Sequence, residues 1–194
     1  MDTSHRRSLT IAAFALASLV FASCSDDPTA PPVDNEHAPP TTITVELVAL
    51  DAAGNPTTQK TTATVRDTTV VKGKARVEGL LQLDAGVQYR GSITLYDESK
   101  SPAENVTSEI VQEKDGHIFL FAPGGGLDAS RILISDKDKD SKGFDVGLTF
   151  LLQATAGPSA TGTINVQLRH YDSGNKNDTV YDTDINSNVP VQIR

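Results

Sequence analysis

From residue 41 onward, apolar and polar side chains alternate, and this period of two restricts the fold more than any other feature of the chain. Ile164, Val166 and Leu168 alternate with polar residues, which is typical of a strand with one buried and one solvated face. In residues 144–152 the apolar side chains share one face while Leu151 occupies the other, as expected of a central strand. Residues 41–194 are therefore predicted to form one all-β domain.

Segments of this kind are rich in Val, Ile and Thr, and Gly, Pro, Asn and Asp interrupt them at intervals of roughly 8 to 15 residues. The predicted strands cover residues 43–47, 61–71, 77–83, 89–96, 118–122, 131–135, 144–154, 162–170 and 189–193. Two stacked sheets accommodate both half-buried and fully buried strands, so we expect an immunoglobulin-like antiparallel β-sandwich of about nine strands. An open β-barrel is the alternative. Residues 103–115 fit either one or two helical turns or a polar edge strand.

The first 23 residues have a different character from the rest of the chain. A basic segment with Arg6 and Arg7 precedes an apolar run over residues 9–21, which ends in the small pair Ala22 and Ser23. This order is typical of a secretory signal peptide. As a helix the apolar run would span only about 20 Å, which is well short of a hydrocarbon core of about 30 Å. We therefore expect residues 1–23 to be a cleaved leader.

Cys24 is the only cysteine of the chain and directly follows this leader. Residues 19–24, with the sequence LVFASC, resemble the lipobox of bacterial lipoproteins, whose cysteine becomes the acylated first residue of the mature protein. The resemblance implies lipidation of Cys24, and two or three acyl chains are a sufficient membrane anchor. Cleavage nearby, which would leave Cys24 as a free thiol, is the alternative.

Residues 24–40 are predicted to be a tether between this lipid and the folded domain. Five of the ten prolines lie between residues 25 and 40, a composition that favours extended polyproline II conformation. At about 3.1 Å per residue the tether would reach about 50 Å. Residues 25–27, with the sequence SDD, resemble the short acidic signal that carries many Bacteroidota lipoproteins to the cell surface. An acidic start to a solvated linker is the alternative, and the lipid would then anchor the protein at the periplasmic face.

Charge and motifs exclude several function classes. The formal net charge is −8 and the basic residues are scattered, so no positive patch is available for nucleic acid. The chain contains no nucleophile elbow, and the glycines at 124–126 lack the Lys-Ser/Thr pair that follows in a phosphate-binding loop. We therefore expect a protein that is not an enzyme.

Two histidines, His117 and His170, fall within the predicted domain, each at the end of a predicted strand. If those strand ends adjoin, the two imidazoles with Asp115, or with Glu113 or Asp172, would form a nitrogen and oxygen site for zinc or a similar metal. The alternative is that each histidine makes hydrogen bonds at a strand end without any metal.

An acidic loop offers a second candidate metal site. Asp136, Asp138 and Asp140 are spaced two residues apart, which would let their carboxylates converge on a calcium ion. The loop lacks the glycine and the final glutamate of an EF-hand, since Ser141 and Gly147 occupy those positions, and its three lysines oppose cation binding. A solvated loop between strands is the alternative.

Several short stretches in order along the chain resemble one family of small Bacteroidota lipoproteins that carries the label "type 1 periplasmic binding fold superfamily protein". The matching stretches are residues 42–45, 89–95, 102–110, 117–119, 136–143, 146–148, 168–170 and 182–185. The label itself conflicts with the pattern, because such a fold needs alternating strands and helices over roughly twice this length. The resemblance implies an accessory lipoprotein encoded near a TonB-dependent receptor, with His at positions 117 and 170.

These observations favour a non-enzymatic binding or accessory module that is anchored in the outer membrane and faces the cell surface. The expected partners are the membrane, through the N-terminal lipid, and a TonB-dependent receptor that takes up a nutrient or a metal. No cofactor is expected apart from a candidate zinc or calcium ion. The alternative is a structural or adhesive envelope protein without a small-molecule ligand.

Overall fold

The computed structural model describes residues 39–194, and these form two open β-sheets with one short helix. The predicted leader, Cys24 and nearly all of the predicted tether lie outside the described residues. The elements in chain order are β1 (Thr42–Leu50), β2 (Pro56–Arg66), β3 (Val77–Gly79), β4 (Leu81–Leu83), β5 (Gln88–Asp97), β6 (Glu104–Asn105), α1 (Thr107–Gln112), β7 (His117–Gly124), β8 (Ile132–Ser135), β9 (Thr149–Ala154), β10 (Ala160–His170) and β11 (Asp182–Ile193). No helix within residues 39–194 is long and apolar enough to cross a bilayer.

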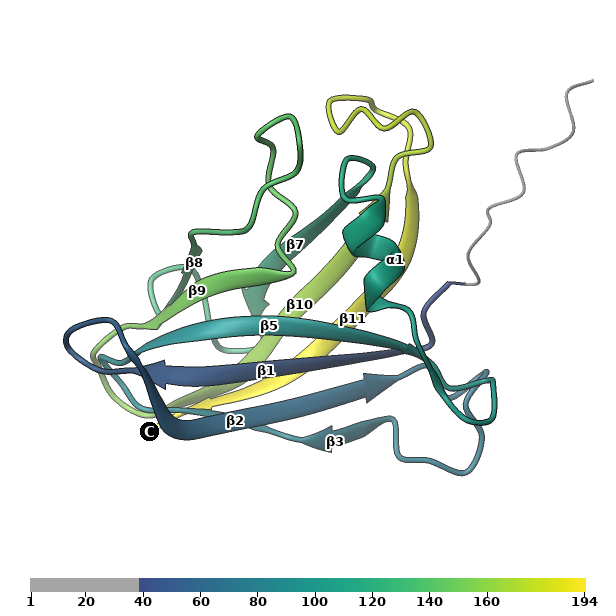
Figure 1. Cartoon of the computed structure of the whole chain (residues 1–194). Coiled ribbons are helices and arrows are strands. Elements are labelled where there is room, and N and C mark those ends of the chain that lie inside the picture. The colour runs from purple at the N-terminus through teal and green to yellow at the C-terminus, as the bar shows by residue number, and fades with distance from the viewer. Residues whose placement is uncertain (1–38) are drawn as a thin grey trace, which may run out of the picture. The chain divides into compact units, whose positions relative to one another are not determined.

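The two sheets pack as a β-sandwich, which confirms the predicted fold class and sets the barrel aside (Figure 1). One sheet has the strand order β3-β2-β1-β5-β9-β8, with β6 paired to β5, and the other has the order β4-β11-β10-β7. Every pairing is antiparallel except that of β4 with β11. The structure contains eleven strands where about nine were predicted.

Two strands are added, one because a predicted strand divides in two and one because residues 103–115 include a short strand. The segment predicted as one strand over residues 77–83 breaks at Leu80, so that β3 joins one sheet and β4 the other. Gly79, the last residue of β3, has a φ of 83°, which a residue with a Cβ atom rarely adopts. Residues 103–115 contain both structures left open above, the two-residue strand β6 and the six-residue helix α1.

The core fills the space between the sheets with side chains from alternate strand positions. Ile43, Val45 and Leu47 of β1 are at most 3% exposed, in agreement with the period of two. Phe119 of β7 and Leu168 of β10 are completely buried in the same cluster. His117 is the first residue of β7 and His170 is the last residue of β10, so the inward-facing rows of both strands end in an imidazole at the same end of the sheet.

Three loops gather at the end of the sandwich where β7 begins and β10 ends (Figure 1). The loop from α1 to β7 is joined to the loop from β8 to β9 because Asp115 accepts hydrogen bonds from the backbone N–H and the hydroxyl of Ser141. Lys142 donates to the carbonyl of Gly174, which joins the loop from β8 to β9 to the loop from β10 to β11. Contacts between loops therefore hold this end of the domain together.

Candidate metal centre

His117 and His170 are neighbours across the pairing of β7 with β10, as the sequence hypothesis required. Their rings are stacked, with centroids 4.4 Å apart and planes inclined by 4°. The side chain of His117 is 3% exposed and that of His170 is 15% exposed. His170 is thus the ring that solvent reaches more readily, and His117 is held inside the sandwich.

The backbone fixes the orientation of His117. Its Nδ1 atom lies 2.9 Å from the carbonyl oxygen of Glu113, the residue that follows α1. A carbonyl can only accept a hydrogen bond, so Nδ1 carries a proton, and in the neutral tautomer with that proton the lone pair is on Nε2. This arrangement is common for histidines that bind metals, because the hydrogen bond sets both tautomer and ring orientation.

Glu113 joins the two histidines, whereas the predicted ligand Asp115 does not. One ligand-type atom each from Glu113, His117 and His170 all lie within 4.8 Å of one another. Asp115 turns instead to Ser141, and the hydrogen bonds from the hydroxyl and backbone N–H of Ser141 hold the pKa of the Asp115 carboxyl below its usual value. Asp172 reaches His170, with an oxygen 3.6 Å from Nδ1.

These donors are of a kind that zinc binds, but the stacked rings must move to share an ion. Donor atoms around a tetrahedral zinc are about 3.3 Å apart, given metal–ligand bonds of about 2.0–2.1 Å. The lone pairs of stacked imidazoles lie in parallel planes, so an ion placed between the rings lies outside both planes. Rotation of His170, the more exposed ring, removes this conflict, and the exposed side chain of Glu113 can follow.

The acidic loop gathers oxygen atoms around a cation, but that cation is a lysine. Asp140 accepts hydrogen bonds from the backbone N–H groups of Lys142 and Phe144 through Oδ1, while Oδ2 lies 2.9 Å from Nζ of Lys176. Lys176 also donates to the backbone carbonyl of Asp145 at 2.9 Å. The ammonium group thus takes the place that the calcium hypothesis gave to a metal ion.

The other two aspartates of the calcium hypothesis do not join Asp140. Oδ1 of Asp138 accepts hydrogen bonds from the backbone N–H groups of Gly147 and Thr149, at 3.0 and 2.9 Å. Asp136 is exposed and has a φ of 44°. In residues 39–194 these aspartates form no group of three carboxylates with metal-binding proximity. Their contacts support a structural role for the loop.

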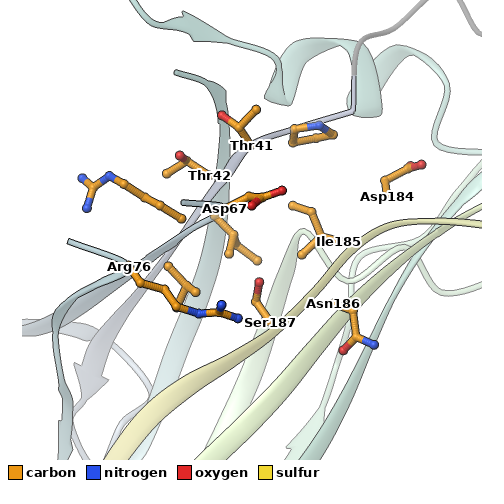
Figure 2. Close-up of a pocket in the computed structure, with 12 residues that line it drawn as sticks. Thr41, Thr42, Asp67, Arg76, Asp184, Ile185, Asn186 and Ser187 are labelled. Atoms are coloured by element: carbon orange, nitrogen blue, oxygen red, sulfur yellow. The ribbon is translucent and has the colours of Figure 1, made fainter. Parts of the chain in front are cut away.

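A polar pocket of about 270 Å³ opens between β1 and β2 of one sheet and β11 of the other (Figure 2). Arg76, Asp67 and Asp184 bring charge to its wall. Hydrogen bonds from the Thr69 hydroxyl and backbone N–H lower the pKa of the Asp67 carboxyl, so this residue is anionic at neutral pH. Sequence reasoning assigned none of the three to a site.

The domain is thus an open two-sheet β-sandwich with two stacked histidines and a glutamate at its loop-bearing end. Comparison with protein-family models, with curated proteins and with solved structures found no significant match.

Proposed function

We propose that this protein is a lipid-anchored protein of the outer membrane that acts as a non-enzymatic binding module at the cell surface, and that its ligand is a divalent metal ion of the zinc class. The observation that carries the proposal is the convergence of Glu113, His117 and His170 within 4.8 Å. Two nitrogen donors and one carboxylate favour zinc and similar ions over calcium, which prefers oxygen.

The location rests on the sequence of residues 1–40. The leader, the lipobox-like residues before Cys24 and the proline-rich tether together support a lipid anchor with a reach of about 50 Å. A module of this kind could pass metal to a TonB-dependent receptor, which is the partner that the family resemblance implies.

A second function has a specific observation in its favour. The stack of His117 on His170 and the bond from His117 to the Glu113 carbonyl connect α1, β7 and β10 without any ion. The histidines would then only stabilise the loop-bearing end of a structural or adhesive envelope protein.

Zinc binding separates the two functions. We expect protein stripped with a chelator to bind one zinc ion per chain in calorimetric titration with zinc chloride. Zinc at 100 times its dissociation constant should stabilise the fold by about 2.7 kcal/mol, because only the folded chain presents the assembled site. His117→Ala and His170→Ala should lose both effects, and His37→Ala, in the predicted tether, should keep them. A wild-type chain that neither binds zinc nor gains stability would contradict the proposal.

The anchor is tested by Cys24→Ser. We expect the wild-type chain in the outer-membrane fraction of cells and the variant in the soluble fraction, because the thiol is the attachment point for the acyl chains. Ser25→Ala serves as the matched control and should stay with the membrane. Equal membrane association of Cys24→Ser and the wild type would show that the lipid is not the anchor.

A further inference from the structure

The pairing of β10 with β11 contains an irregularity next to the histidines. Leu168 pairs with Ile185, but the next residue, Arg169, pairs with Thr183. Asp184 lies between these two partners and has no counterpart on β10. It is therefore the extra residue of a β-bulge, a feature that redirects side chains and is frequent beside functional sites.

The bulge changes the direction in which Asp184 faces. Beyond it, Ile185 and Val189 are buried whereas Asn186 and Asn188 are exposed, and both asparagines hydrogen-bond to Asn165 on the outer face. Strict alternation would place Asp184 on that outer face as well. Instead its side chain is 13% exposed, and its Oδ2 atom lies 3.9 Å from Nε2 of the buried His117.

We propose that Asp184 is the fourth protein ligand of the metal site, an inference that rests on the proposed function. Nε2 is the ring nitrogen that the tautomer of His117 leaves able to bind a metal. Its distance of 3.9 Å from Asp184 is close to the separation of about 3.3 Å between donors on a tetrahedral zinc ion. Asp184 stands outside the group of three residues whose donor atoms lie within 4.8 Å of one another. The complete set of two imidazoles and two carboxylates would therefore form only when Glu113 and the ring of His170 move toward Nε2 of His117.

A fourth protein ligand has a chemical consequence. Catalytic zinc sites keep a position for water, whereas four protein ligands close the coordination sphere. Asp184 also lies on the wall of the polar pocket (Figure 2), so the ligand that closes the sphere borders a cavity of about 270 Å³. The site would hold a metal ion without activating water, as a binding module requires.

Cobalt(II) reports on this inference because four-coordinate cobalt absorbs visible light much more strongly than five- or six-coordinate cobalt. We expect the metal-free full chain to develop the intense four-coordinate spectrum on titration with cobalt chloride. Asp184→Asn should give a weak spectrum of higher coordination and an affinity at least about 100-fold lower, since losing even an outer-shell partner typically costs 10–100-fold.

Asp182→Asn is the matched control, because it makes the same charge change on the same strand at an exposed position. It should keep the wild-type spectrum and affinity, and circular dichroism should confirm the fold of both variants. If the chain binds cobalt and Asp184→Asn matches the wild type, or if both variants lose affinity equally, the role of Asp184 is overturned while the three-residue site stands. If the wild-type chain binds neither cobalt nor zinc, the proposed function itself fails.

Discussion

Lys176→Met is expected to lower the free energy of unfolding by about 3–5 kcal/mol, because it leaves the Asp140 carboxylate buried without its counter-ion. The two side chains are 3% and 0% exposed, and their charged atoms are 2.9 Å apart. Burial alone would raise the pKa of Asp140, but hydrogen bonds from Lys176 and from the backbone N–H groups of Phe144 and Lys142 outweigh it and lower that pKa. The carboxylate is therefore charged at neutral pH and depends on Lys176.

Urea denaturation followed by circular dichroism measures this loss. Lys139→Met is the matched control, since Lys139 pairs with Asp145 at the surface, where the side chains are 57% and 38% exposed. That variant should change stability by less than about 1 kcal/mol. The double variant Asp140→Asn with Lys176→Met should recover part of the loss, because it removes the buried charge and keeps an acceptor for the two backbone groups. A loss in Lys176→Met no larger than that in Lys139→Met would refute the prediction.

Phe119→Ala should destabilise the domain by about 3–5 kcal/mol, through lost apolar burial and the cavity left behind. Phe119 is completely buried two residues after His117, and its backbone N–H donates to the carbonyl of Val146. A Cβ atom on Gly147 would lie 3.1 Å from Cβ of Phe119, so the loop from β8 to β9 packs closely against this residue. The cavity would therefore form where β7 meets that loop.

Thermal and urea unfolding of Phe119→Ala should be compared with those of Phe144→Ala. Phe144 is 39% exposed, so truncating its side chain removes less apolar burial and opens no enclosed cavity. We expect a clearly smaller loss in Phe144→Ala. Equal losses in the two variants would contradict the placement of Phe119 in the core.

The alternation of side chains was sufficient to predict the sandwich, since a strand with one or both faces buried needs apolar residues at regular positions. It was insufficient where a strand has few apolar residues. The first half of β11 was missed because residues 182–188 are almost entirely polar, their outward side chains being solvated and one residue being bulged. The break between β3 and β4 was missed because the apolar residues in 77–83 are spaced as in a single strand. In the structure the chain passes from one sheet to the other within this segment.

The candidate site, like the fold, could be predicted from the sequence only in part. The positions of His117 and His170 at strand ends indicated that they would meet if those ends adjoined, and the structure pairs them. Strand parity gives the wrong face for Asp184, because a bulge shifts the period by one residue and leaves no sequence signal. Local spacing in the acidic loop suggested calcium, whereas the cation that Asp140 binds is Lys176, which a different loop supplies.

The order of strands in the smaller sheet is expected to delay its formation during synthesis. β11, formed by residues 182–193, lies between β4 and β10, so it is the only strand of that sheet that joins residues 81–83 to the strands after residue 117. Until β11 has been synthesised, β4 has no neighbour in its sheet and one edge of β10 is unpaired. Pairings between residues so distant in sequence form slowly. A nascent chain of this sequence is therefore expected to complete this sheet only when residues 182–193 are available for pairing.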